Sequence, residues 1–254
     1  MLSRDTIRSW ITSLGAFGHL QLDAVRAILR GAVNPREVCR QIVFVGVNSL
    51  GISTLTALFT GMVLALQTAY GLERFGAKHY VGNVAGLAFI RELGPMLTAV
   101  VLCGRVGAGI AAEIASMVVT EQVDAMTALG ADPVARLVAP RVIAAMIATP
   151  LLVVFANLTG IYGGLAIAVF ELNVSAHVYF QSLYYTILIR DIFDSLIKSA
   201  VFGFIVAAVA CFQGLQARGG TEGVGRTTTS AVVIGCVWIF IADFFVTKLL
   251  LLIG

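Results

Sequence analysis

The sequence predicts an all-α protein that crosses a membrane several times. Of its 254 residues, 59% are hydrophobic and 12% are charged, whereas a soluble domain carries about 45–50% apolar and about 25% charged residues. Several charge-free runs are long enough for a spanning helix, which needs about 20 apolar residues. This composition excludes a soluble enzyme and a disordered chain, and the net charge of +3 is too small to indicate nucleic-acid binding.

Residues 1–40 are expected to form an amphipathic segment that lies in the membrane surface. Apolar residues recur at helical spacing with arginines turned away, which is typical of an interfacial helix; they are Ile7, Trp10, Ile11, Leu14 and Phe17. The segment has no continuous apolar stretch, so a cleaved signal peptide is not expected. An ordinary amphipathic helix packed on protein stays open as the alternative.

Residues 41–254 are expected to form a five-span domain. The spans are predicted at 41–72, 81–112, 142–170, 199–217 and 227–254. The first is longer than the roughly 30 Å hydrocarbon core requires, so it should tilt, kink or begin in the interface. In the third, Gly160 and Gly164 form a GxxxG pattern, which we interpret as packing within the chain.

The distribution of arginine and lysine predicts that the N-terminus is cytoplasmic and that the C-terminus, after five spans, lies on the outer side, which the resemblance described below would make the periplasm. One side would hold Arg4, Arg8, Arg26, Arg30, Arg36, Arg40, Arg136, Arg141, Arg218 and Arg226, and the other only Arg74, Lys78, Arg190 and Lys198. Cytoplasmic segments then include a helix at about 113–130 and a loop at about 217–229. An outer segment at about 171–194, rich in aromatic residues, is expected to be an interfacial helix.

The second span carries the densest polar signal. Arg91, Glu92 and Arg105 lie within it, although a charge at membrane depth costs roughly 2.5–3.5 kcal/mol. Pro95 removes a backbone hydrogen bond and loosens the helix beside Arg91 and Glu92. The interpretations that remain open are a substrate path, a structural ion pair, and a helix end at which Arg91 extends to the membrane boundary.

The segment after the second span resembles a docking element. In a continuous helix, Glu113, Met117, Glu121 and Asp124 would share one face, and Gly130 followed by Pro133 should end it. Such an acidic helix suits a cytosolic partner, and a solvated loop helix is the alternative.

The sequence offers no enzymatic centre, cofactor or metal site. Motifs for zinc or a hydrolase triad are missing, and the four cysteines form no CxxC pair. Residues 220–227 resemble a phosphate loop with arginine in place of lysine, but they lie between two membrane helices, where a nucleotide fold is not expected. We expect a cytoplasmic turn capped by residues 227–229, so any ATP would be hydrolysed by a partner.

Several ordered motifs resemble the MlaE/YrbE permeases of ABC transporters over about residues 34–250. They are Arg-Glu-Leu-Gly-Pro (91–95), Gly-Arg-Val-Gly-Ala (104–108), Ala-Ala-Glu (111–113), Thr-Glu-Gln-Val-Asp-Ala (120–125), Asp-Pro (132–133), Pro-Arg (140–141) and Gly-Val-Gly-Arg-Thr-Thr-Thr (223–229). The outer segment 71–83 carries no matching pattern.

The resemblance implies a homodimer in the bacterial inner membrane, with two cytosolic ABC ATPase subunits and a periplasmic MCE-domain (MlaD-like) protein. Phospholipid or a related lipid would move between the membrane and that protein. The ATPases would contact the helix with Glu121, Gln122 and Asp124, while Arg91, Glu92 and Leu93 match positions near the lipid cavity. Neighbouring periodicity adds Leu66 and Tyr70 to the expected tail path.

Two other functions remain as alternatives. A self-contained secondary transporter or channel should carry ionisable groups in several spans and an inverted repeat. The sequence concentrates its charges in one span, with Asp243 alone in the last, and shows no repeat. A structural assembly subunit is the other alternative, and dependence of an ATPase on this chain would distinguish it from a transporter.

Overall fold

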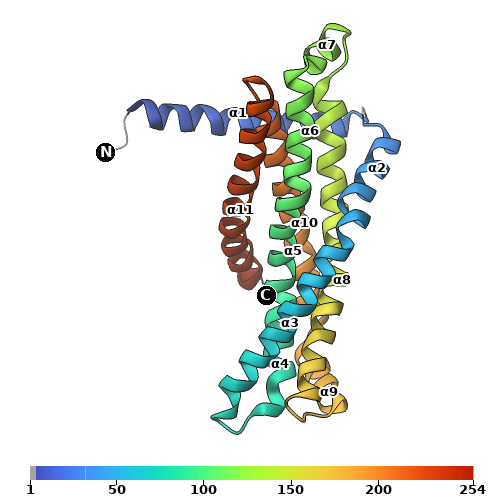
Figure 1. The fold of residues 1–254 in the computed structure, drawn as a ribbon, viewed down its shortest axis with the longest axis vertical. Helices are drawn as coiled ribbons and strands as arrows, with labels where there is room; N and C mark the ends of the chain where they lie inside the picture. The colour runs from blue at the N-terminus through green and yellow to red at the C-terminus, as the bar shows by residue number, and fades with distance from the viewer. Residues whose placement is uncertain (1–3, 32, 254) are drawn as a thin grey trace.

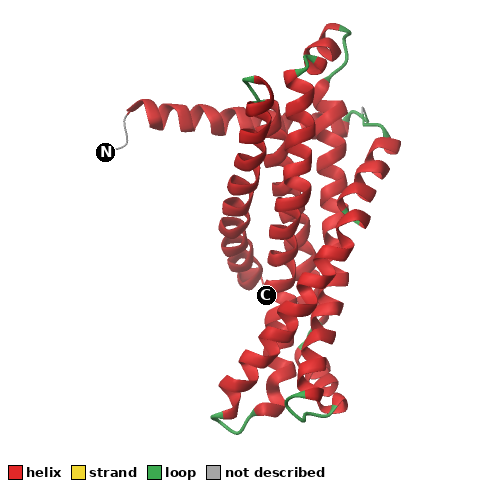
Figure 2. Ribbon diagram, viewed as in Figure 1, coloured by secondary structure: helices red, strands yellow, loops and turns green. Residues whose placement is uncertain are grey.

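The structure, a computed structural model, describes residues 4–31 and 33–253, and that part of the chain consists of helices joined by short loops, with no strand (Figure 2). Five helical segments are long and apolar enough to cross a membrane, namely Pro35–Glu73, Lys78–Val119, Val134–Phe170, Ile189–Leu215 and Gly220–Leu252. Each overlaps one of the five predicted spans. The prediction of an all-α polytopic membrane protein is therefore confirmed.

The long helices form an elongated bundle (Figure 1). Helix α8 (Ala139–Phe170) contacts α3 (Leu50–Glu73) and α10 (Ile189–Leu215), and α11 (Gly220–Ile253) packs on α10 and on α6 (Ala108–Val119). One end of the bundle carries α7 (Gln122–Ala128), and the opposite end carries α9 (Ala176–Thr186). We refer to these as the α7 end and the α9 end.

Helix α1 (Arg4–Leu29) lies across the bundle near its α7 end (Figure 1). Its second half packs on the protein, because Ala24 is buried in the main core and the Phe17 ring meets Phe212 edge-to-face at 5.4 Å. The structure does not describe the side chains of Ile7, Trp10 and Ile11. Their contact with a membrane surface stays a prediction.

The first span is broken, as its excess length predicted. Helix α2 (Pro35–Val45) begins at the Asn34 cap, whose side chain accepts a hydrogen bond from the Arg36 N–H at 3.0 Å. A single tight turn, η1 (Val47–Ser49), then separates α2 from α3. Arg105 bridges this break, since its Nη1 donates to the Phe44 carbonyl at 3.3 Å and to Ser49 Oγ at 2.6 Å. This charge of the second span therefore holds two helices together.

The second span is a helix with two wider, π-helical turns. It runs through α4 (Val81–Ala88), η3 (Phe89–Leu93), α5 (Gly94–Leu102), η4 (Cys103–Gly107) and α6, after a short turn η2 (Lys78–Tyr80). Such turns interrupt the regular hydrogen bonding of a helix and occur frequently at functional sites. Here they coincide with the polar motifs at 91–95 and 104–108.

The predicted helix at 113–130 is wrong as a continuous element. Helix α6 ends at Val119, Glu121 adopts a left-handed backbone with φ of 58°, and α7 begins at Gln122. Val118, Val119 and Thr120 are β-branched and poor helix formers, and the Thr120 hydroxyl donates back to the Ser116 carbonyl at 2.8 Å. The expected common face is thus broken. Gly130, with φ of 75°, does end α7 as expected.

Two other predicted segments are shorter in the structure. Within 171–194, α9 is a separate helix, and residues from Ile189 onward already belong to α10. Within 217–229, α11 begins at Gly220, so residues 220–227 are helical and do not form a loop. The hydroxyls of residues 227–229 donate to carbonyls of the preceding turn instead of capping it, which satisfies them inside the helix.

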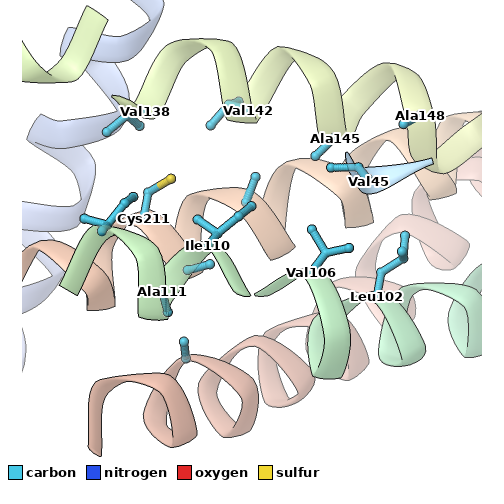
Figure 3. Close-up of a cluster of buried hydrophobic side chains, with 14 of the residues drawn as sticks. Val45, Leu102, Val106, Ile110, Ala111, Val138, Val142, Ala145, Ala148 and Cys211 are labelled. Atoms are coloured by element: carbon cyan, nitrogen blue, oxygen red, sulfur yellow. The ribbon is translucent and has the colours of Figure 1, made fainter. Parts of the chain in front are cut away.

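The core is built from small and branched apolar side chains at close helix crossings (Figure 3). Val45, Val106, Ile110, Val138 and Cys211, from five different elements, are among its buried members. Farther toward the α9 end, α3 crosses α8 at Gly61 and Gly160. A Cβ on Gly61 would lie 2.0 Å from the Gly160 carbonyl oxygen, which confirms that the GxxxG pattern packs within the chain.

We expect Gly61→Ala to lower the free energy of unfolding by about 1–3 kcal/mol, because the added methyl forces α3 and α8 apart. Thermal unfolding of the detergent-purified protein measures this effect. Gly51→Ala is the matched control, since a Cβ on this glycine of the same helix meets nothing within 4 Å. Equal melting temperatures for the two variants would contradict close packing at this crossing.

Candidate functional site

A proline in the second span exposes a backbone acceptor that a buried lysine satisfies. Pro95 has no N–H, so the Arg91 carbonyl lacks the donor that an α-helix would supply four residues later. Lys198 Nζ, from α10, donates to this carbonyl at 3.1 Å. The Lys198 side chain is only 3% exposed, so the lysine is held inside the bundle by its partners.

Two carboxylates balance the charge of Lys198. Its Nζ donates to Glu92 Oε2 at 2.6 Å and lies 3.2 Å from Asp243 Oδ1 on α11. The Asp243 oxygen forms an ion pair but no hydrogen bond with any described residue. Lys198 is therefore tied firmly to η3 and more weakly to α11.

A second ion pair lies beside the first. Arg91 Nε donates to Asp191 Oδ1 at 2.7 Å, and its Nη2 lies 2.5 Å from the same oxygen. The Asp191 side chain is 1% exposed, and its Oδ2 accepts a hydrogen bond from the Leu188 N–H at 2.9 Å. The carboxylate thus lies at the N-terminus of α10, where the helix dipole favours a negative charge.

We call Arg91, Glu92, Asp191, Lys198 and Asp243 the charge cluster. Its two cations pair with its three carboxylates. Each charged side chain of the cluster therefore has a partner of opposite charge, and one negative charge is left in excess. Compensation is required because an uncompensated charge is costly away from water. The cluster joins the second, fourth and fifth spans.

The cluster forms the polar wall of a cavity. Arg91, Glu92 and Lys198 line a cavity of about 300 Å³, together with the apolar Leu250 and Leu251 at the end of α11. A second hollow of about 510 Å³ has a mostly apolar lining that includes Phe240 and Phe244, and both hollows include Glu92, Thr247 and Leu251. One side can therefore contact charge and the other hydrocarbon, an arrangement that suits an amphipathic molecule.

Only part of the expected tail path lies at this cavity. Arg91 and Glu92 line it, whereas Leu93 packs beside Phe89 in a separate apolar cluster. Leu66 is half-buried and Tyr70 is 62% exposed, and both lie on α3. Within one protomer, the structure does not bring these two residues to the charged wall.

The expected coupling residues divide between two elements. Glu113 and Met117 lie on α6, and Glu113 pairs with Arg141 at 2.9 Å. Glu121, Gln122 and Asp124 are exposed at the α7 end. The sequence interpretation missed a neighbouring apolar side chain, Leu129, which is 86% exposed there.

Three members of the charge cluster were also missed as site residues, namely Asp191, Lys198 and Asp243. A signal for them existed, because ionisable side chains inside apolar helices are rare and usually have partners. The sequence analysis expected the charges to be concentrated in one span, with Asp243 alone in the last, but Asp243 is paired and the fourth span adds Asp191 and Lys198. The second, fourth and fifth spans each contribute part of the cluster, and a sequence pattern within one helix does not reveal partners on another.

We expect Lys198→Met to lower the free energy of unfolding by about 1–3 kcal/mol, because the partly exposed carboxylates of Glu92 and Asp243 lose the cation that they share. Adding Glu92→Gln and Asp243→Asn should restore much of the loss. Thermal unfolding in detergent checks both. Lys78→Met is the control, since the Lys78–Glu73 pair is well exposed and such pairs contribute about 0–1 kcal/mol. An equally small effect at Lys198 would show that the cluster does not stabilise the bundle.

Comparison with known proteins identifies the family. The family model described as Permease MlaE matches residues 38–249. A probable ABC transporter permease protein of Rickettsia typhi is 40% identical over 98% of this chain and 96% of its own length, and one of Synechocystis sp. is 40% identical over 98% and 94%.

The Arabidopsis thaliana protein TRIGALACTOSYLDIACYLGLYCEROL 1, chloroplastic, is 39% identical over 87% of this chain and 63% of its own length. The family match covers the five spans, both π-helical turns of the second span and α7. The chain therefore belongs to the MlaE family of ABC transporter permeases.

Proposed function

We propose that this permease moves phospholipid or a related lipid between the bacterial inner membrane and a periplasmic MCE-domain protein. It would act as a homodimer, driven by two cytosolic ATPase subunits that hydrolyse the ATP. The observation that carries the proposal is the cavity with a charged wall on one side and an apolar wall on the other.

The lining of the two hollows supports a lipid as cargo. A zwitterionic or anionic headgroup finds a cation and a carboxylate in Arg91 and Glu92, while acyl chains find Phe240 and Phe244. The name of the Arabidopsis relative contains that of a glycosylated diacylglycerol, which also favours a lipid. A cavity of about 300 Å³ matches only the smallest pockets for drug-sized ligands, so two acyl chains would extend onto the outer surface of α11.

The exposed apolar surfaces support a homodimer. Large apolar side chains of α11 face outward, among them Val233, Val237, Phe240 and Phe244. A second protomer covering this face would close the apolar hollow and enclose the tails. Leu66 and Tyr70 lie on α3, and we retain them as tail-path residues on the proposal that the seam between protomers also includes α3.

The α7 end is the proposed docking place of the ATPases. Helix α7 extends beyond the spans (Figure 1), with Glu121, Gln122 and Asp124 exposed for polar contacts and Leu129 for an apolar one. Arginines of α1 and α2 lie toward the same end, which supports a cytoplasmic orientation under the positive-inside rule; they include Arg26, Arg36 and Arg40.

In this mechanism the ATPases close on ATP and bring the two α7 helices together. The movement passes along the spans and narrows the space between the protomers. Arg91 and Glu92 remain fixed by Asp191 and Lys198, whereas α11 moves against them because the Lys198–Asp243 contact is the weaker link. Lipid is thereby expelled toward the periplasmic partner or accepted from it.

The charge cluster favours one rival function, a self-contained ion-coupled transporter, because ionisable groups from three spans meet. The two functions differ in their energy source. We expect lipid movement by the reconstituted complex to require ATP and to be unchanged when a protonophore collapses the proton gradient. Movement without ATPase subunits would refute the proposed function.

Docking at α7 predicts that the double variant Glu121→Lys, Asp124→Lys co-purifies about tenfold less ATPase and stimulates ATP hydrolysis about tenfold less. The reason is that the reversed charges would repel the partner surface that the wild-type residues attract. Affinity purification and phosphate release measure the two effects. Glu222→Lys is the control, because this exposed acidic residue lies in the first turn of α11 instead. Unchanged binding in the double variant would exclude α7 as the docking place.

The cavity predicts that Leu251→Trp slows lipid transfer about tenfold, because the indole fills the space that the two hollows share. ATPase co-purification should be unaffected. Leu249→Trp is the control, as this exposed residue of α11 lines neither hollow. Transfer of fluorescent phospholipid between vesicles gives the rate, and equal rates for the two variants would place the lipid path elsewhere.

A further inference from the structure

The ion pair between Glu113 and Arg141 lies outside the charge cluster and joins α6 to the first turn of α8. We propose that it is a positioning clamp, which makes the two stems of the α7 hairpin move as one body, so that force on α7 reaches the spans. This inference rests on the proposed function and assigns a role to two residues that line neither hollow.

The guanidinium of Arg141 joins three segments. Arg141 is in the first turn of α8, and its Nη2 lies 2.9 Å from Glu113 Oε2 on α6. Its Nη1 donates to the Leu137 carbonyl at 3.0 Å, within the π-helical turn η5 (Val134–Val138). The arginine is 3% exposed, whereas Glu113 is 47% exposed, so the contact reaches from inside the bundle to its surface.

The clamp lies at the base of the α7 hairpin. The chain enters the hairpin from α6 and leaves it through η5 into α8. The two stems do not carry a push on α7 equally, because the left-handed Glu121 interrupts one of them and η5 interrupts the other. The Glu113–Arg141 pair connects the stems beyond both of these points.

A third element supports the same base. Ala27 of α1 packs on Ala135 of η5 and on Ala139 of α8. A displacement carried by the clamp therefore reaches α6, α8 and α1 together. The clamp is the only ion pair among the described residues that joins α6 to α8.

Stability alone does not require an ion pair here. Arg141 is buried, but Glu113 is 47% exposed. Even a fully buried pair can often be replaced by residues of similar size without loss of stability, whereas removing one partner alone is destabilising. A purely structural pair predicts normal coupling once both charges are removed. A positioning clamp predicts lost coupling even in a fully folded protein.

The test uses the complete complex with its co-purified ATPase, reconstituted in vesicles of phosphatidylethanolamine and phosphatidylglycerol that contain a fluorescent phospholipid. The measured quantity is lipid transferred per ATP hydrolysed. We expect Glu113→Gln with Arg141→Met to lower it about tenfold, with ATPase co-purification and melting temperature close to those of the wild type. Arg40→Gln is the control, because Arg40 forms an exposed pair with Glu37 inside α2 alone.

Hydrogen–deuterium exchange supplies a second readout. In the same double variant, amides of residues 120–138 should exchange faster while those of α3 and α10 keep the wild-type rate, because only the hairpin is released. The single variant Arg141→Gln should lower the lipid transferred per ATP in the same way. Where this variant does not fold, the double variant supplies the result.

Wild-type transfer per ATP in the folded double variant would overturn the clamp. So would unchanged exchange across residues 120–138. Failure of the proposed function is distinguishable, because the wild-type complex itself would then bind no ATPase or move no lipid.

Discussion

A lysine inside an apolar bundle has to be paired, and much of the site follows from the pairing of Lys198. Pro95 leaves the Arg91 carbonyl without a helical donor, and Lys198 occupies that position while contacting Glu92 and Asp243. In a low-dielectric environment these contacts bring together helices that are distant in sequence. The cavity borders this junction, so its polar wall is a consequence of charge compensation.

The wider helical turns explain how the remaining charges are accommodated. Each of the three π-helical turns lies beside an unusual polar contact, with Arg91 and Glu92 in η3, Arg105 in η4, and the Leu137 carbonyl in η5 bound by Arg141. Such turns change the direction of side chains along a helix. They also interrupt regular hydrogen bonding, so the rigid helices meet at sites where bending is easiest.

Rigid and adaptable parts are therefore combined in one bundle. The crossing of α3 and α8 at Gly61 and Gly160 leaves no room for even a methyl group, whereas α11 contributes a weaker ion pair and a largely exposed apolar face. A permease driven from one end needs both properties. In the proposed mechanism the tight crossing would transmit displacement, and the loosely held helix would change the shape of the hollow beside it.

The sequence by itself determined the fold class, the five spans and the family, and it showed that the first span is too long to cross as one straight helix. These follow from local composition and ordered motifs, since burial in lipid demands long apolar helices whatever their partners. Only the tertiary structure decided that Lys198, Asp191 and Asp243 meet Arg91 and Glu92, and that α6 and α7 are separate helices. Ion pairs form between side chains far apart in sequence, and the left-handed Glu121 depends on a backbone conformation that helical periodicity does not encode.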